Sequence, residues 1–279
     1  MSYPLRWSNI AFSLKLRYLR LKFASGGYSF ADKINSYKLK KAMDGAYRPK
    51  KSSINGGEPT SSTYYIRHKK FANLKLKYNL TDRYQMEICK EFFLQNLYDL
   101  ERIKFIPELI IDCGGFKGYF SILASEKFPN AEIICIEPHP INSVDIEEHL
   151  NSNNSKTIKL IPKGISRSKE PIKFFVDGTI GSLDTKLTSE KFHMVETIDL
   201  EELIVNDTPL LLKVDVEGAE LEFFPTIIDR LPQQCFVFLE THDGWNSLNE
   251  IKNKFLLNGF SFELISERGE FIDSIAQRC

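Results

Sequence analysis

The sequence predicts an α/β fold in which a mostly parallel sheet ends in an antiparallel hairpin and is preceded by a basic N-terminal extension. From residue 81 onwards, short apolar runs alternate with stretches of helical periodicity, which is typical of a parallel sheet with helical crossovers. Near the carboxyl end, two further runs are joined through Arg268-Gly269, which indicates a hairpin. Residues 1–80 show neither pattern.

Charge separates the chain into two parts. The 279 residues have a net charge of +0, but residues 1–80 contain 17 Lys and Arg against three acidic residues, a net charge of +14. Residues 81–279 therefore have a net charge of −14. A chain of this length fits one domain with an extension. We predict that residues 1–80 form a basic extension, part of the substrate site or of an interaction surface, and that residues 81–279 form the α/β domain.

Within the extension, Leu5–Phe23 mixes Trp, Phe and Leu with Lys and Arg in a pattern that fits neither a helix nor a strand. Two interpretations stay open: a segment that makes peripheral contact with a membrane or binds a partner, and an arm that packs on its own domain. Gly, Pro and Ser cluster in Ser52–Pro59, which predicts a loop. The extension is therefore expected to be irregular, with one or two short helices.

Neither membrane insertion nor export is predicted. No stretch of roughly 18 uncharged apolar residues occurs, so no transmembrane segment is expected, and the amino terminus lacks the pattern of a secretory signal. The cysteines are scattered and lack zinc-ligand spacing, which indicates a reduced, cytoplasmic protein without structural zinc. They are Cys89, Cys113, Cys135, Cys235 and Cys279.

The first elements of the α/β domain follow in order after residue 81. Asp82, with Gln85 three residues later, resembles the capping box of a helix. The apolar run Leu109–Asp112 predicts a buried strand before a glycine-rich turn and a helix. Glu132–Glu137 predicts the next strand and Ile141–Leu150 the next helix. Such short connections are typical of parallel strands with right-handed crossovers.

The later elements complete the sheet. Three runs are apolar enough to form interior strands covered on both faces: Thr157–Ile161, Leu210–Val216 and Phe236–Glu240. Two extra strands are expected before the fourth core strand, and a hairpin at the carboxyl end. The extra strands are Pro171–Val176 and Met194–Ile198, and the hairpin pairs Ser261–Ile265 with Phe271–Ile275.

The turn after the first strand predicts a nucleotide cofactor. Gly114 and Gly118 permit a positive φ and a close approach to the backbone, and the free N–H groups of a helix start favour electron-rich groups. Asp112 at the mouth of this turn would repel a pyrophosphate, which a dinucleotide turn exists to bind. The same carboxylate suits an ammonium or sulfonium group. The pattern therefore favours S-adenosylmethionine over NAD, unless Asp112 only caps the helix.

A second acid supports this interpretation. Glu137 ends the next strand, 23 residues after Gly114. In cofactor-binding α/β folds, an acid about 20 residues beyond the glycines accepts hydrogen bonds from ribose hydroxyls. The alternative is a solvent-facing Glu137 before the Pro138–Pro140 turn.

Four motifs resemble those of the FkbM-type methyltransferases. The resemblance covers roughly residues 84–243, and the last motif is the most specific because it is a long unbroken string. The motifs are Ile111–Phe120, Ile136–Pro140 with Asn142, Val195–Leu200 and Leu212–Glu220. The resemblance implies a Rossmann-like class I methyltransferase sheet in residues 81–279, S-adenosylmethionine as the cofactor, and methylation of hydroxyls of macrolides, sugars, and polysaccharide or glycolipid precursors.

The resemblance also implies roles for residues of the turn. Asp112, Gly114 and Gly118 would line the methionine part of the cofactor, and Glu137 its ribose. The chain departs from the family at Phe116, where Asn is more usual, and at Gly115, where Ala is usual. The full set of predicted cofactor residues is Asp112, Gly114, Gly115, Gly118, Tyr119, Glu137 and Pro138.

Three residues are candidates for a catalytic base. Asp215 and Glu217 end the fourth core strand, and His242 follows the next strand, so all three lie at the edge where α/β sheets place their sites. A hydroxyl is a poor nucleophile until a base removes its proton. Alternatively, Glu217 caps the helix that begins at Gly218, Asp215 positions the cofactor, and His242 has no role. The three residue types also permit a divalent metal, but no ligand spacing predicts one, so no metal is expected.

We predict an S-adenosylmethionine-dependent O-methyltransferase whose partner is a small-molecule or glycan acceptor: a sugar, a polysaccharide or glycolipid precursor, or a natural product. One alternative is an NAD-dependent oxidoreductase, which Asp112 and the short terminal hairpin disfavour. Another is a binding protein that has lost the reaction, which Gly115 and Phe116 motivate. Nucleic-acid methylation is disfavoured because no base-flipping motif follows the fourth strand. The sequence does not indicate an oligomeric state.

Overall fold

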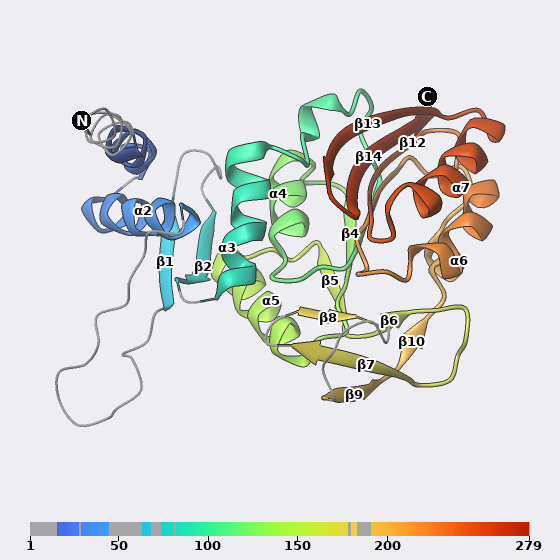
Figure 1. The fold of residues 1–279 in the computed structure, drawn as a ribbon, viewed down its shortest axis with the longest axis horizontal. Coiled ribbons are helices and arrows are strands. Elements are labelled where there is room, and N and C mark those ends of the chain that lie inside the picture. The colour runs from blue at the N-terminus through green and yellow to red at the C-terminus, as the bar shows by residue number, and fades with distance from the viewer. Residues whose placement is uncertain are drawn as a thin grey trace, which may run out of the picture. The chain divides into compact units, whose positions relative to one another are not determined.

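The computed structural model of the protein describes two compact units, one within residues 1–95 and one within residues 96–279 (Figure 1). The described residues are 16–27, 29–44, 63–67, 74–80, 82–177, 180–182 and 191–278. The loop predicted at Ser52–Pro59 and residues 5–15 of the segment Leu5–Phe23 lie outside them. The units divide at residue 95, whereas the composition changes near residue 80, so the roles assigned to residues 1–80 and 81–279 stay predictions.

The first unit is more regular than the sequence suggests. Residues 16–24 are helical, and β1 (Thr63–Arg67) pairs antiparallel with β2 (Lys75–Asn79). Ser29 and Asp32 form a capping box at the start of the next helix, α2. The helices are α2 (Phe30–Met43), α3 (Arg83–Lys90) and the π-helix η2 (Glu91–Gln95). Leu39, Met43, Ile66 and Tyr78 are each only 1% exposed, so this unit has a core of its own.

Asp82 caps α3 as predicted, but its partner acts differently. Asp82 Oδ1 accepts a hydrogen bond of 3.0 Å from the Gln85 amide. The Gln85 side chain accepts a hydrogen bond of 2.6 Å from the amide of Asn79, at the end of β2. The pair therefore joins β2 to α3.

The second unit is built on a seven-stranded sheet in the order β13-β14-β12-β11-β3-β4-β5. All neighbouring pairs from β5 to β12 are parallel, and β14 runs antiparallel to both of its neighbours. This confirms the predicted α/β class, the mostly parallel sheet and the terminal hairpin. The strands are β3 (Leu109–Cys113), β4 (Glu132–Ile136), β5 (Ile158–Ile161), β11 (Leu210–Val214), β12 (Cys235–Thr241), β13 (Ser261–Arg268) and β14 (Phe271–Arg278).

Helices cover both faces of this sheet. From β3 the chain moves outward through β4 to β5, and from β11 it moves outward in the opposite direction, so right-handed crossovers put the two groups of helices on opposite faces. Figure 1 shows α4 and α5 on one side and α6 and α7 on the other. The helices are α4 (Tyr119–Lys127), α5 (Pro140–Asn153), α6 (Glu220–Ile227) and α7 (Gly244–Leu257), with short 3-10 turns at Leu100–Arg102, Leu200–Leu203 and Ile228–Arg230.

The core lies where the predicted interior strands meet these helices. Every residue of β3, β11 and β12 is buried. Against one face of the sheet pack Phe223, Phe224 and Phe255, and the rings of Phe224 and Phe255 meet edge to face with centroids 5.5 Å apart. Among the described residues, no helix combines the length and the apolar character needed to cross a membrane.

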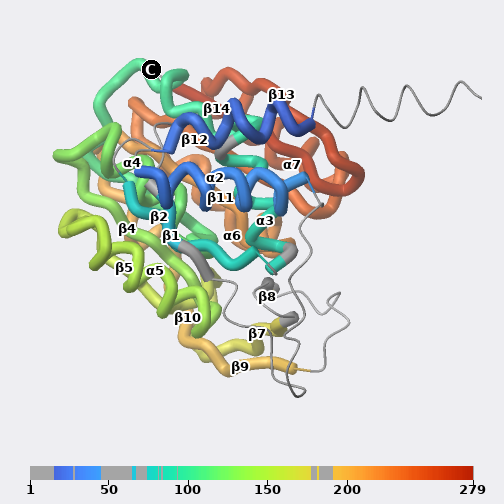
Figure 2. The backbone as a smooth tube through the Cα atoms, turned by 90° about the vertical axis from the view of Figure 1, so that its left-hand side faces the viewer, coloured from blue at the N-terminus to red at the C-terminus, as the bar shows by residue number. Residues whose placement is uncertain are grey.

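Two small sheets are inserted before β11. β7 (Ile172–Asp177) pairs antiparallel with β8 (Ile180–Ser182) and β9 (Phe192–Val195), while β6 (Gly164–Ile165) pairs parallel with β10 (Thr197–Ile198). The extra strand predicted at Pro171–Val176 is therefore β7. The strand predicted at Met194–Ile198 is wrong as one element, because it breaks at Glu196 and its halves join different sheets. Figure 2 shows β7, β8 and β9 at the end of this unit away from β13 and β14.

Close packing between β4 and the turn after β3 explains why residue 115 is glycine. A Cβ at Gly115 would lie 2.3 Å from Sγ of Cys135, a fully buried residue of β4, and 3.5 Å from Ile146 Cδ1. The thiol thus fills the space that the alanine more usual in the resembled family would need.

An added methyl group at Gly115 tests this packing. We expect Gly115→Ala to lower the free energy of unfolding by about 1–3 kcal/mol, the usual cost of overpacking. The cost should fall in a Cys135→Ala background, which lacks Sγ, with a coupling of at least about 0.5 kcal/mol. Urea unfolding of the four proteins measures this coupling. Equal costs in the two backgrounds would contradict the packing argument.

Candidate functional site

The predicted site residues gather at the carboxyl edge of the sheet, where the chain order reverses between the adjacent strands β3 and β11. Open α/β sheets bind their ligands at this place. The turn after β3 is held by hydrogen bonds from the amides of Gly114 and Gly115 to the carbonyl of Ile136, at 3.0 and 2.9 Å. Gly114 has a φ of +85°, and a Cβ there would lie 1.8 Å from the carbonyl oxygen of Asp215. Only a bare backbone fits between the two strand ends.

Asp112 lies fully buried below this turn. Its Oδ2 accepts a hydrogen bond of 2.7 Å from Ser121 Oγ. Its Oδ1 accepts no hydrogen bond from the described residues and faces Lys213 Nζ at 3.4 Å. Burial raises the pKa of Asp112, and the charge of Lys213 opposes that shift. A buried carboxylate oxygen with spare acceptor capacity is the kind of group that a polar ligand satisfies.

Lys213 connects the two strand ends, although the sequence motif gave it no role. Its buried ammonium lies 3.4 Å from Asp112 Oδ1 and 3.3 Å from Asp215 Oδ2, and it donates a hydrogen bond of 2.8 Å to the Gly114 carbonyl. Burial alone would lower the pKa of Lys213, but the two carboxylates raise it. A lysine inside an apolar strand is itself a signal, because a buried charge requires a partner.

Glu137 ends β4 and binds the turn from its other side. Its carboxylate accepts hydrogen bonds from the amides of Phe116 (2.7 Å) and His139 (2.8 Å). Burial raises its pKa to about 7, against the effect of these bonds. Oε1 also accepts a hydrogen bond of 3.5 Å from Asn142 Nδ2, so Oε2 is the oxygen that retains a second lone pair for a ligand hydroxyl. Phe116 has a φ of +50°, a conformation in which Asn is enriched, so a local backbone requirement explains the residue more usual there.

The remaining predicted cofactor residues surround the turn. Gly118 has a φ of +76° and immediately precedes α4. Pro138 is half-buried beside Glu137. Tyr119 is 2% exposed and its ring packs against His149 of α5, with centroids 5.5 Å apart. The packing of Tyr119 accounts for its burial, and its contact with a cofactor stays a prediction.

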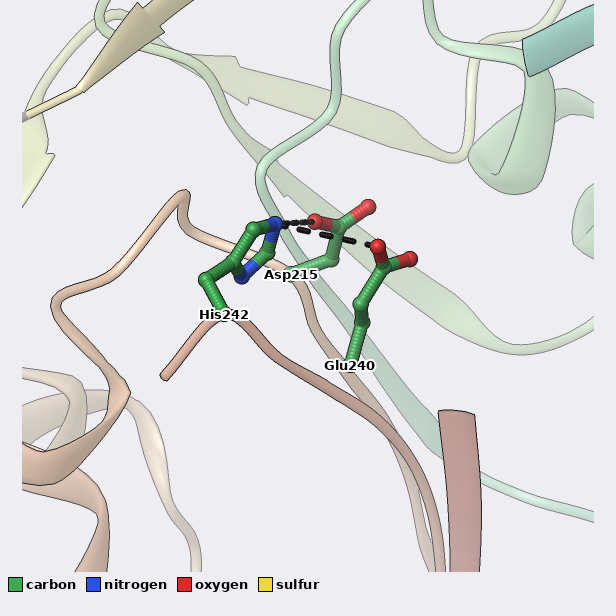
Figure 3. A group of neighbouring side chains, drawn as sticks. All are labelled: Asp215, Glu240 and His242. Atoms are coloured by element: carbon green, nitrogen blue, oxygen red, sulfur yellow. Dashed lines mark ion pairs between the residues drawn. The ribbon is translucent and has the colours of Figure 1, made fainter. Parts of the chain in front are cut away.

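A group of four carboxylates and one imidazole, which we name the acid–histidine cluster, lies after β11 and β12. Nδ1 of His242 lies 2.8 Å from Glu220 Oε1. Nε2 lies 3.3 Å from Glu217 Oε2 and 3.7 Å from both Asp215 Oδ1 and Glu240 Oε1. Figure 3 shows the carboxylates of Asp215 and Glu240 turned toward this nitrogen. The structure thus brings together all three residues predicted as bases, and adds two acids that the sequence analysis missed.

Glu220, rather than Glu217, occupies the turn before α6. Its Oε1 accepts hydrogen bonds from the amides of Val216 (3.3 Å) and Gly218 (3.2 Å). The interpretation that Glu217 caps a helix beginning at Gly218 is therefore wrong, because α6 begins at Glu220. Glu217 has a φ of +57°, and its side chain is 37% exposed. The turn directs Glu217 toward solvent at the rim of the cluster.

The charges in the cluster give the three predicted bases different pKa values. Burial would raise the pKa of Asp215, but Lys213 and His242 hold it below its usual value. Burial would lower the pKa of His242, but Glu220, Glu217 and Asp215 raise it to about 10. Burial and the neighbouring acids raise the pKa of Glu217 to about 7. Near neutral pH, His242 carries its proton and Asp215 is ionised, so Glu217 is the group that titrates.

Comparison with known proteins locates the site within a family match. Residues 112–262, more than half of the chain, match the family model described as the Methyltransferase FkbM domain. Relatives include methyltransferase sdnD from Sordaria araneosa, 26% identical, and hexuronic acid methyltransferase AglP from Haloferax volcanii, 28% identical. These matches cover 48% and 49% of this chain and 66% and 57% of the relatives. The chain thus spans less than two thirds of either relative.

Solved structures give more distant matches. One is TYW2 from M. jannaschii in complex with AdoMet, which is 11% identical with a TM-score of 0.46. That alignment covers 82% of this chain and 92% of the other.

Replacement of Lys213 by an apolar residue tests whether its ammonium compensates the negative charge of the buried carboxylates. We expect Lys213→Met to lower the free energy of unfolding by about 3–5 kcal/mol, because it leaves buried carboxylates unpaired. Without the ammonium, the pKa values of Asp112 and Asp215 rise in the folded protein. The folded state then binds more protons than the unfolded state, so stability falls with increasing pH. The loss relative to wild type should be larger at about pH 8 than at about pH 5.

Urea unfolding at both pH values measures this difference. Lys117→Met is the matched control, because the Lys117 side chain is only 3% exposed but its partner Asp145 is 20% exposed and can be hydrated. Losses of the same size and pH dependence in both variants would contradict the role assigned to Lys213.

Proposed function

Because the chain belongs to the FkbM methyltransferase family, as its four motifs predict, we propose that it transfers the methyl group of S-adenosylmethionine to a hydroxyl of a sugar, a glycan precursor or a natural product. The observation that carries this proposal is the position of the acid–histidine cluster beside the glycine turn. Lys213 contacts both, through Gly114 on one side and Asp215 on the other. A cofactor at the turn and an acceptor at the cluster would therefore be neighbours.

The residues of the turn fit this cofactor. Asp112 Oδ1, which faces Lys213 but accepts no hydrogen bond of normal geometry from the described residues, has acceptor capacity for a cationic amino-acid group, and Glu137 Oε2 has a lone pair for a ribose hydroxyl. Gly114, which has no room for a Cβ, lets the ends of β3 and β11 approach each other, which brings the turn beside Asp215. When bound, the cofactor supplies a methyl group already activated by the positive charge on its sulfur. The residues of the chain then have to orient the two reactants, which is worth several kcal/mol of the barrier.

Glu217 is the group that we propose accepts the proton of the acceptor hydroxyl. It lies at the exposed rim of the cluster, whereas the side chains of Asp215 and His242 are 16% and 9% exposed. His242 lies 3.3 Å from Glu217 and is itself oriented by Glu220, so it would position the base without being the base. A base at this place contributes typically about 10²–10⁴-fold to the rate.

The proposed acceptor class is supported by the relatives and by charge. One relative is named as a hexuronic acid methyltransferase, which places a sugar acid among the acceptors to test first. Residues 1–80 carry a net charge of +14, which suits an anionic acceptor or partner. We propose that this basic region contributes to recognition.

Calorimetry with adenosylhomocysteine tests the cofactor site. We expect Asp112→Asn and Glu137→Gln each to weaken binding by about 10- to 100-fold, the usual effect of losing a hydrogen bond to a charged group. Glu147→Gln, on the exposed face of α5, is the matched control and should bind like wild type. If both site variants also bind like wild type, the cofactor assignment is wrong.

A second measurement tests the base. With an acceptor identified from a panel of glycans and hydroxy acids, we expect Glu217→Gln to lower kcat by about 10²–10⁴-fold. Its affinity for adenosylhomocysteine should stay that of wild type, because the residue faces the acceptor side. Glu250→Gln on the exposed surface of α7 serves as the control. Full activity of Glu217→Gln would remove the residue from the mechanism.

A further inference from the structure

Three side chains of the acid–histidine cluster have the spacing of metal ligands. One carboxylate oxygen of Asp215, one of Glu240 and a ring nitrogen of His242 all lie within 4.8 Å of one another. Bonds of about 2.0–2.4 Å to an octahedral cation place neighbouring ligand atoms roughly 2.8–3.4 Å apart and opposite ones roughly 4.0–4.8 Å apart. The distances of 3.7 Å from Nε2 to each carboxylate are a few tenths of an ångström longer than the separation of neighbouring ligands. Figure 3 shows the three groups converging from the ends of β11 and β12.

The imidazole of His242 is held in the orientation that a metal ligand requires. Nδ1 is occupied by Glu220 at 2.8 Å, and Glu220 is fixed by the amides of Val216 and Gly218. A carboxylate on the second nitrogen is the usual arrangement for a metal-binding histidine. The side chain of His242 is only 9% exposed, and Nε2 lies 3.3 Å from the carboxylate of Glu217 and 3.7 Å from those of Asp215 and Glu240. Nε2, the nitrogen that Glu220 does not occupy, therefore faces carboxylates, and a cation bound there would replace the Nε2 proton of the imidazolium.

The cationic side chains near the acid–histidine cluster do not neutralise its negative charge. Lys213 contacts Oδ2 of Asp215, the oxygen that faces away from His242, and shares its charge with Asp112. Arg268 lies 3.4 Å from Glu240 Oε1 and shares its charge with Asp273. With Glu217 and Glu220 added, four carboxylates surround one imidazole, whose single positive charge when protonated does not balance them. Buried charges of one sign require compensation, which a cation at the centre would supply.

We propose that Asp215, Glu240 and His242 bind one divalent cation of the Mg²⁺ or Mn²⁺ type. Two carboxylates and a single imidazole form an oxygen-rich ligand set, which favours these cations over softer metals. The residues whose types permit a metal in the sequence include Glu217 in place of Glu240. Glu240 and His242 are alternate residues at the end of one strand and share a face, which puts Glu240 in the set and leaves Glu217 at the rim.

The consequence for the acceptor rests on the proposed function. Three protein ligands leave about three positions of an octahedral cation open. An acceptor with a second oxygen beside the methylated hydroxyl, such as a vicinal diol or an α-hydroxy acid, would occupy two of them. Bound oxygen loses its proton more easily, because the cation stabilises the negative charge. Glu217 would then take that proton from a hydroxyl already polarised.

Electron paramagnetic resonance of Mn²⁺ tests the site without any acceptor. The chelator-treated protein of 279 residues should bind one Mn²⁺ per chain, seen as loss of the free-ion signal. We expect Glu240→Gln and His242→Gln each to weaken binding at least about 10-fold. Glu147→Gln, which removes an exposed acid of α5 that is not part of the acid–histidine cluster, should bind Mn²⁺ like wild type. Far-ultraviolet circular dichroism shows that each variant is folded, and binding of adenosylhomocysteine by the same samples is measured in parallel.

The outcomes separate this inference from the proposed function. Failure of wild type to bind Mn²⁺ at about 1 mM, or equal binding by wild type and both ligand variants, overturns the metal site. If Mn²⁺ binds and depends on Glu240 and His242 while adenosylhomocysteine does not bind, the metal site holds and the cofactor assignment is wrong. If the cofactor binds and Mn²⁺ does not, the metal site alone is wrong.

Discussion

The buried ion pairs of Lys213 are the interaction on which the rest of the site depends. The parallel register of β3 and β11 sets Lys213 opposite Asp112, so sheet pairing itself brings the two charges together. The same ammonium contacts Asp215 and the carbonyl of Gly114. Taking carboxylates out of water costs several kcal/mol each unless a cation compensates them. The acids that give this edge its chemistry can therefore be buried here because one strand carries a lysine in an otherwise apolar run.

Two groups of acids lie on opposite sides of this lysine and differ in how far they are exposed to solvent. On the side of the glycine turn, Asp112 and Glu137 are nearly inaccessible and present only spare acceptor positions. On the other side, four acids surround His242, and Glu217 reaches the solvent. This difference in exposure suits two separate roles: the buried acids would bind one reactant, and the exposed acid would remove a proton from the other. It also suits methyl transfer, in which the donor arrives activated and the acceptor does not.

The sequence predicted the α/β sheet, its interior strands and the glycine turn. Buried strands and helices require apolar residues at a fixed period, and a positive φ favours glycine, so both can be recognised from residue types. It did not predict the helix start at Glu220, because Glu217 and Gly218 both adopt positive φ and turn the chain before the helix begins. Glu240 was missed for another reason: a buried acid at a strand end is distinguished from an ordinary surface Glu only by its neighbours in space. Lys213 was visible in the sequence, but its partners became clear only from the strand register.

A structure of the protein with adenosylhomocysteine bound tests the central claim most directly, namely that the acids at the β3–β11 edge exist to hold a cationic amino-acid cofactor. The account predicts the ligand's amino group on the side of Asp112 and its ribose hydroxyls within hydrogen-bond distance of Glu137. It also predicts that the sulfur points toward the acid–histidine cluster. A ligand bound elsewhere, or a complex in which both carboxylates face away from it, would contradict the account.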